Sequence, residues 1–233
     1  METGFLNIKK DQDWTSFDVV AKLRGITGIR KIGHCGTLDP LATGVLIVAV
    51  GRESTKMIDT FHQYKKTYIA ELEFGKTSDT YDSTGEITLC HAEPAYRQGR
   101  PVEVSSVQDF KKEIEKYIGD IEQIPPAFSA KKINGRKAYD LAREGKKVEL
   151  KPSNVTIDEI KILNFEWPKA TVEVTCGTGT YIRSLIHDLG QDLSCGAIMT
   201  GLQRTKIGTW VVDDGVGIED LTRENWTDHL FTI

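Results

Sequence analysis

Hydrophobic and polar residues follow two patterns along the chain, and both predict strands. Residues 45–50 form an uninterrupted apolar run between two glycines, which is typical of a strand buried on both faces. Residues 65–75 alternate instead, with Tyr68 on the apolar side, as in a strand that is buried on one face. The same alternation predicts further strands over residues 155–165 and 171–176.

Two segments have features typical of helices. Thr15 or Ser16 can cap a helix whose apolar residues recur at intervals of three and four up to Gly25. A second helix is expected to begin near Thr180, which can cap it, directly after a turn rich in glycine and threonine. Short helices and strands alternate irregularly and no internal repeat is visible. We therefore expect an α/β (α+β) fold with a mixed, largely antiparallel sheet and flanking helices.

Composition is that of an ordinary soluble globular protein, with 39% hydrophobic and 27% charged residues in a chain of 233. The N-terminus lacks the features of a signal peptide and no stretch has the apolar length of a membrane span, so we expect a cytoplasmic protein without membrane association. The four cysteines and five histidines have no metal-ligand spacing. Glycine-rich phosphate-binding motifs are also missing, so we expect neither a metal nor a nucleotide cofactor.

A lone carboxylate stands on the glycine-rich segment that precedes the buried run. Pro40 disfavours helical dihedral angles at Asp39, and Leu38 and Leu41 flank it, so its carboxylate is held on a stiff loop at the edge of the core. Such a residue is either a turn aspartate that bonds its own backbone or a carboxylate placed there for chemistry. The local residues leave both interpretations open.

Tyr68 and Arg183 are two further candidates, each with an ordinary alternative. Tyr68 is either a core tyrosine or a flat face for a nucleic-acid base. Arg183 falls in the first turn of the helix expected near Thr180, where its charge opposes the positive end of the helix dipole. It is therefore either an exposed surface residue or is compensated by a carboxylate or phosphate. Asp39 would suit it, because an adjacent arginine keeps a carboxylate ionised and fixes its direction.

Basic residues concentrate in one part of an acidic chain. The net charge is −4, yet residues 131–151 contain eight Lys or Arg against three acids. Within them, Asn134-Gly135 is a strong hairpin signal, and Lys131, Lys132 and Arg136 flank that turn. Such a basic hairpin is either a solvated surface or a contact for nucleic acid.

Five motifs resemble those of the TruB family of tRNA pseudouridine synthases, in the same order and at the same spacing. They are Gly33-His-Cys-Gly-Thr-Leu-Asp-Pro-Leu-Ala-Thr-Gly44, Lys66-Thr-Tyr68, Asp79-Thr-Tyr-Asp-Ser-Thr-Gly85, Ile124-Pro-Pro-Ala-Phe-Ser-Ala-Lys-Lys132 and Gly179-Thr-Tyr-Ile-Arg183. The resemblance covers roughly residues 4–212. It implies a pseudouridine synthase fold with a central catalytic cleft over residues 1–212, and isomerisation of uridine to pseudouridine at position 55 in the T loop of tRNA, without metal or cofactor.

The resemblance also implies roles for individual residues. Asp39 would be the essential carboxylate, either attacking C1′ or removing the 2′ proton, and Arg183 would pair with it. Tyr68 would stack on the flipped uracil and is a candidate for removing the C5 proton. The remaining substrate contacts would be His34, which would fill the space left by the flipped base, and Tyr181 and Leu202, which would line the base pocket.

RNA binding is expected from the hairpin at about residues 124–140 and from the loop at residues 79–85, which would grip the T stem-loop. The expected RNA contacts are Lys66, Asp82, Lys131, Lys132 and Arg136. Residues 213–233 are expected to be an acidic C-terminal tail, too short for the PUA domain of many relatives, and we expect a monomer. Lys10-Asp11 stands where the family usually has Lys-Pro.

Two other functions are compatible with this resemblance. One is an RNA-binding protein that helps tRNA to fold, in which the chemistry is secondary. The other is the catalytic subunit of a guide-RNA ribonucleoprotein, a related branch of pseudouridine synthases whose chains carry additional terminal segments.

Overall fold

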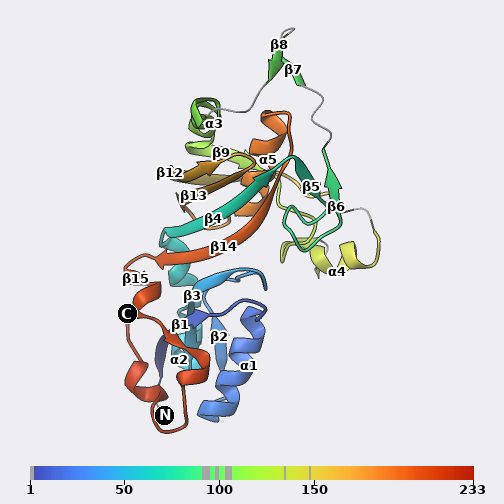
Figure 1. Ribbon diagram of the computed structural model, residues 1–233. Helices are drawn as coiled ribbons and strands as arrows, with labels where there is room; N and C mark the ends of the chain where they lie inside the picture. Colours follow the sequence, from blue (N-terminus) through green and yellow to red (C-terminus); the bar gives the residue numbers. More distant parts are fainter. Residues whose placement is uncertain (1–2, 91–94, 98–99, 103–106, 134, 147) are drawn as a thin grey trace. The chain divides into compact units, whose positions relative to one another are not determined.

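The computed structural model describes residues 3–90, 95–97, 100–102, 107–133, 135–146 and 148–233. The chain divides into two compact units (Figure 1). The first comprises Met1–Ile69 and Leu202–Ile233, and the second comprises Ala70–Gly201. Two long strands, β4 and β14, contribute residues to both units.

The first unit is built around β3, in a sheet with the strand order β16-β1-β3-β14; β2 also pairs with β3, and β15 with β14. The strands of this unit are β1 (Gly4–Lys10), β2 (Ile32–His34), β3 (Thr43–Val50), β15 (Trp210–Val211), β16 (Val216–Gly217) and the ends of β4 (Lys66–Phe74) and β14 (Ala197–Ile207). Its helices are α1 (Ser16–Thr27), α2 (Arg52–Lys56), η1 (Ile58–Gln63), η3 (Val212–Asp214), η4 (Ile218–Asp220) and η5 (Trp226–His229).

Strand β3 is buried on both faces, as its apolar run predicts. Every residue from Gly44 to Val50 is buried. Leu46, Val48 and Val50 belong to one hydrophobic cluster, and the residues between them, Val45, Ile47 and Ala49, belong to another. Because neighbouring side chains point to opposite faces of a strand, the two clusters lie on its two sides. The strand is therefore a rigid support for the loop that precedes it.

Helix α1 begins with a complete capping box, which confirms Thr15 as its cap. The Thr15 hydroxyl accepts from the Asp18 amide, and the Asp18 carboxylate accepts from the Thr15 amide. The helix continues past the expected end at Gly25 to Thr27, and its C-cap residue, Gly28, has a left-handed φ of 70°. It contacts β2, as Figure 1 shows, and its buried residues Val19, Val20 and Leu23 complete the cluster on one side of β3.

Residues 213–233 contribute to the core of the first unit. Strand β16 pairs in parallel with β1, and Phe231 forms a bridge with Phe5. Ile218, Leu221 and Trp226 are buried in the same cluster as α1. This segment is therefore part of the folded first unit, where it pairs with β1 and contributes to the core.

The second unit contains a sheet with the strand order β14-β4-β13-β12-β9 and three two-stranded pairs, β5–β6, β7–β8 and β10–β11. Its remaining strands are β5 (Lys76–Ser78), β6 (Ile87–Leu89), β7 (Ala95–Arg97), β8 (Arg100–Val102), β9 (Gly119–Gln123), β10 (Lys132–Ile133), β11 (Arg136–Lys137), β12 (Ser153–Glu166) and β13 (Lys169–Cys176). Its helices are α3 (Val107–Ile114), η2 (Glu115–Tyr117), α4 (Ala138–Arg143) and α5 (Ile182–Asp192).

The expected fold class is confirmed. The strands predicted over residues 155–165 and 171–176 are β12 and β13, which pair with each other antiparallel. Most strand pairs are antiparallel, while β1 with β16 and β3 with β14 are parallel. No helix in the described part of the chain has the length and apolarity needed to cross a membrane.

The predicted cap of the second helix is wrong. Helix α5 begins at Ile182, its N-cap residue is Tyr181, and that residue makes no side-chain capping bond. The Thr180 hydroxyl donates instead to the Gly177 carbonyl at 3.1 Å. Thr180 therefore closes the preceding turn and is not available to the helix.

Candidate active site and RNA-binding surface

Asp39 lies half-buried on the loop between β2 and β3, residues 35–42, hereafter the Asp39 loop. Its carbonyl accepts from the Ala42 amide at 3.0 Å. Directly before it, the Leu38 amide donates to the Ser16 hydroxyl at 2.8 Å, and that hydroxyl donates to the Leu38 carbonyl at 3.1 Å. Ser16 is the first residue of α1 and only 3% exposed. The loop is therefore fixed to the start of α1 immediately before Asp39.

A buried lysine holds the other side of this loop. Lys10, at the end of β1, is 1% exposed, and its ammonium donates to the carbonyls of Trp14 at 2.6 Å, Asp11 at 2.8 Å and Pro40 at 3.4 Å. Burial lowers the pKa of Lys10 to about 8, against the opposing effect of the negative charge of Asp39. The sequence did not predict that Lys10 holds the Asp39 loop. A lysine within an apolar strand is nevertheless unusual.

The other predicted residues of the first unit lie around the same core. Tyr68 and Leu202 are partly buried and pack against the cluster that contains Leu38. His34 is the last residue of β2, half-buried and in register with Val48 of β3. Tyr68 and Leu202 therefore pack against the same cluster as Leu38, the residue directly before Asp39. Tyr68 is partly buried against the core, and its contact with a nucleic-acid base stays a prediction.

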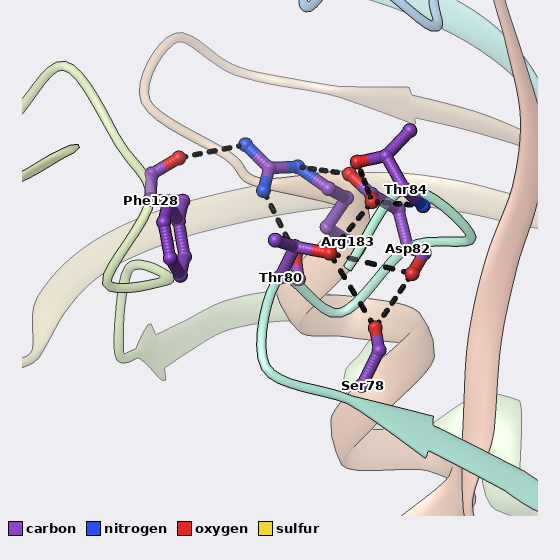
Figure 2. Close-up of polar contacts among 6 residues, drawn as sticks. All are labelled: Ser78, Thr80, Asp82, Thr84, Phe128 and Arg183. Carbon is purple, nitrogen blue, oxygen red and sulfur yellow. Dashed lines mark hydrogen bonds and ion pairs between the residues drawn. The ribbon is translucent and has the colours of Figure 1, made fainter. Parts of the chain in front are cut away.

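Arg183 is not an exposed surface residue. It is 5% exposed, and its Nε lies 3.6 Å from Oδ2 of Asp82 (Figure 2). Its two terminal nitrogens donate to the carbonyls of Thr80 at 2.9 Å and Phe128 at 3.1 Å. The carboxylate of Asp82 therefore supplies compensation for a cation in the first turn of a helix. Sequence reasoning expected such a group and suggested Asp39, but it did not identify Asp82.

Asp82 is oriented by the threonines on either side of it. Its Oδ1 accepts from the Thr80 hydroxyl at 2.7 Å, the Thr84 hydroxyl at 2.6 Å and the Thr84 amide at 2.9 Å. This leaves Oδ2 facing Arg183, as Figure 2 shows. Asp82 was expected to contact RNA, but it is 4% exposed and its carboxylate is engaged within the protein. We therefore assign it to holding Arg183.

Tyr181, the N-cap of α5, is held by a residue that sequence reasoning missed. The amide group of Gln123 accepts from the Tyr181 N–H at 2.7 Å and donates to the Tyr181 carbonyl at 3.0 Å. Gln123 is 2% exposed. The clamp joins the end of β9 to the start of α5, and no spacing rule in the sequence could have indicated it.

The predicted catalytic and binding residues belong to two different units. Asp39, Tyr68, His34 and Leu202 lie in the first, whereas Arg183, Tyr181 and Asp82 lie in the second. Contacts inside each unit define one fixed carboxylate loop and one fixed guanidinium. The pairing of Asp39 with Arg183 stays a prediction.

The basic hairpin is present as β10 and β11, with Lys131, Lys132 and Arg136 all exposed. Asn134 of its turn lies outside the described residues. Arg136 forms an ion pair with Glu144, which raises the pKa of Arg136. Part of the hairpin's charge is therefore neutralised, and Lys131 and Lys132 are its better candidates for RNA contact.

Lys66, another expected RNA contact, points into the protein. It is 6% exposed, and its ammonium donates to the carbonyl of Phe61 at 3.0 Å. The lysine therefore fixes the turn before β4. The alternating pattern of the strand could not reveal this, because the partner is a carbonyl in the preceding helix η1.

A basic hollow of about 540 Å³ in the first unit was not predicted from the sequence. It is lined by Lys31, Arg52, Thr55 and Lys56. The Gly51 amide donates to the Lys31 carbonyl at 2.8 Å, which brings these two segments together. Its lining thus contains three basic residues, of which Lys56 also pairs with Glu53. Its residues are therefore additional candidates for contact with phosphates.

The sequence matches the models of two consecutive domains. Residues 24–182 match the TruB family pseudouridylate synthase N-terminal domain, and residues 183–231 match the tRNA pseudouridylate synthase B C-terminal domain. Similar proteins named tRNA pseudouridine synthase B include those of Clostridium kluyveri, 43% identical over 99% of this chain and 76% of the relative, and Phocaeicola vulgatus, 42% identical over 97% and 94%. A third, from Bacteroides fragilis, is 44% identical, and the match covers 89% of this chain and 87% of the relative's length.

Solved structures agree with the fold. In a Cbf5-Nop10-Gar1 complex, the matching chain superposes with a TM-score of 0.69 at 26% identity, over 94% of this chain. This chain spans 53% of that longer protein. The match therefore shows that the two proteins share a fold over nearly the whole length of this chain.

Proposed function

The chain belongs to the TruB family of pseudouridylate synthases, and we propose that it converts the uridine at position 55 in the T loop of tRNA into pseudouridine. In this isomerisation the N1–C1′ bond breaks and the base is reattached through C5. The observation that carries the proposal is the half-buried Asp39 on a loop fixed by Ser16 and Lys10 directly before the buried strand β3. A carboxylate held in this way keeps one position during a reaction.

Asp39 is the proposed catalytic carboxylate, and two routes are open to it. It either attacks C1′, which forms a bond to the sugar as the base leaves, or it removes the 2′ proton. Arg183 is its proposed partner. Three of the donor groups of this guanidinium face Asp82, Thr80 and Phe128, so the direction of its charge is set before any substrate binds.

The base would be held by aromatic and apolar side chains. Tyr68, a partly buried residue that packs against a core cluster, stacks on the uracil in this proposal. Leu202 packs against the same cluster, and Tyr181 is held by Gln123 at the start of α5. His34 would occupy the space that the flipped base leaves, because chemistry on a base inside folded RNA requires the base to leave its stack.

The T stem-loop would be held by exposed lysines. Lys131 and Lys132 of the hairpin are exposed, and Lys31 and Lys56 line the basic hollow. Phosphate contacts of this kind set affinity and orientation without reading sequence. Recognition by backbone shape is expected for a structured RNA target.

The proposal is tested by mapping pseudouridine in an unmodified tRNA transcript incubated with the purified chain alone. We expect a single new pseudouridine in the T loop, its loss with Asp39→Asn, and wild-type activity with Asp228→Asn, which changes an exposed aspartate of the same unit. Binding of the transcript by Asp39→Asn should be retained.

Each alternative function predicts a different result. Activity that persists in Asp39→Asn would overturn the assignment of the catalytic carboxylate. Assisted tRNA folding by a chain that forms no pseudouridine would favour the folding helper. Modification that appears only after a guide RNA is added would favour the ribonucleoprotein subunit.

A further inference from the structure

Arg204 lies on β14 at the base of the Asp39 loop. Its side chain is only 2% exposed. Its main chain pairs in parallel with Gly44 of β3, two residues after that loop ends. Gly44 has a φ of 101°, and a Cβ placed there would lie 2.2 Å from the Arg204 carbonyl oxygen. The two strands therefore meet closely at this point because residue 44 has no side chain.

The guanidinium of Arg204 connects both ends of the Asp39 loop. Its Nε donates to the Val45 carbonyl at 2.8 Å, beyond the loop. Its terminal nitrogens donate to the carbonyls of Gly36 at 3.2 Å and Thr37 at 3.4 Å, before Asp39. A planar group whose donors lie on three separate nitrogens in a fixed fork can hold these three carbonyls at once, whereas the three donors of a lysine all radiate from a single nitrogen.

The same guanidinium contacts the second predicted catalytic residue. Its central carbon lies 6.0 Å from the centre of the Tyr68 ring, within the range of a cation–π contact. A single buried side chain thus contacts the loop of the proposed carboxylate and the ring of the proposed stacking residue. All of these residues belong to the first unit.

A buried arginine is a costly way to close a loop. Among the described residues, the hydrogen bonds of Arg204 all go to main-chain carbonyls, so its full charge is desolvated against partial charges. A loop that merely had to be closed could rely on the Ser16 bonds or on apolar packing. Arg204 differs because one side chain contacts β3, the Asp39 loop and the Tyr68 ring at the same time.

We infer that Arg204 is a positioning residue that fixes Asp39 and Tyr68 relative to each other. This inference rests on the proposed function. Arg204 acts through the loop main chain and the Tyr68 ring, and does not itself touch the substrate. Displacement of a reacting group by about 1 Å can lower a rate by about 10²-fold. Weakening the contacts of Arg204 is therefore expected to slow the chemical step without weakening RNA binding.

The test compares Arg204→Lys with Arg24→Lys in single-turnover pseudouridine formation. Arg24 is a matched control, a half-buried arginine of the same unit that donates to the Ile32 carbonyl at 3.3 Å, away from the Asp39 loop. Arg204→Lys should lower the single-turnover rate by 10- to 100-fold and leave the dissociation constant for tRNA within about twofold. Arg24→Lys should change neither. An unchanged rate in folded Arg204→Lys, or an equal loss in both variants, overturns the inference.

Hydrogen exchange supplies a readout that does not require turnover. In Arg204→Lys the Ala42 amide, which donates to the Asp39 carbonyl, should exchange faster, while amides in the middle of β3 should stay protected. In the wild-type protein the Nε–H of Arg204 should exchange slowly, and rapid exchange there overturns the inference even if no variant folds.

The two hypotheses fail in different ways. Activity that survives in Asp39→Asn removes the proposed function. Loss of activity in Asp39→Asn together with a wild-type rate in Arg204→Lys removes only the role of Arg204.

Discussion

Gly44→Ala is the substitution whose effect follows most directly from the geometry next to the Asp39 loop. The new Cβ would lie 2.2 Å from the carbonyl oxygen, 2.9 Å from the carbonyl carbon and 3.0 Å from the amide nitrogen of Arg204. These are main-chain atoms of a paired strand, so they cannot rotate away. Either β3 or β14 must shift where the two strands pair.

The expected cost has two parts that a matched glycine separates. Gly28 also has a positive φ, of 70°, but nothing lies within 4 Å of its would-be Cβ. Gly28→Ala therefore reports the cost of the left-handed backbone alone, about 1 kcal/mol. Gly44→Ala adds an overpacking term of about 1–3 kcal/mol, so its free energy of unfolding should fall by roughly 2–4 kcal/mol.

Urea unfolding followed by tryptophan fluorescence measures this difference, because Trp14, Trp210 and Trp226 all lie in the first unit. Gly44→Ala should also slow single-turnover modification, since the strand that supports the Asp39 loop is displaced, whereas Gly28→Ala should not. A Gly44→Ala protein within about 0.5 kcal/mol of Gly28→Ala would refute the close approach of the two strands, given the usual scatter of independent mutations.

Three further predictions concern charge. Asp82→Asn should destabilise the protein by about 3 kcal/mol, because it removes a buried negative charge that faces the Arg183 guanidinium; the double variant with Arg183→Met should lose less than the sum of the single changes, and additive free energies of unfolding would contradict the pairing. Burial and a neighbouring aspartate raise the pKa of Asp188 from 3.8 to about 6, so the stability that its protonated form contributes is lost as the pH rises through 6. Asp188→Asn should therefore stabilise the protein by up to about 3 kcal/mol at pH 8 and by little near pH 4, and thermal unfolding with the same gain at both values would contradict the shift. Reversing Lys131 and Lys132 to Glu should lower the slope of log affinity for tRNA against log salt by about 2, and an unchanged slope would exclude both from the interface.

The local parts of the fold could be predicted from the sequence. The apolar run of residues 45–50 predicts a strand buried on both faces, and the two clusters around β3 have that arrangement. The start of α1 was also predicted, although the sequence left Thr15 and Ser16 open as its cap and the structure selects Thr15. These features depend on residues close together in the chain, whose periodicity directly reflects backbone geometry.

Long-range contacts could not be predicted in the same way. The dipole argument indicated a compensating group for Arg183, but only the structure shows that Asp82 is that group within the second unit. Lys66 was expected to contact RNA, but its ammonium donates to the Phe61 carbonyl inside the protein. Likewise, Gln123 gives no local sign that it holds Tyr181. Such partners depend on tertiary packing, which spacing along the chain does not encode.

Asp39 and Arg183 are proposed to act on one flipped nucleotide, and a crystal structure of Asp39→Asn bound to a T stem-loop RNA tests this most directly. We predict that the side chain at position 39 lies beside C1′ of the extruded uridine and within hydrogen-bonding distance of Arg183. A structure in which that side chain points into solvent, or lies far from Arg183 with the uridine bound, would contradict the account.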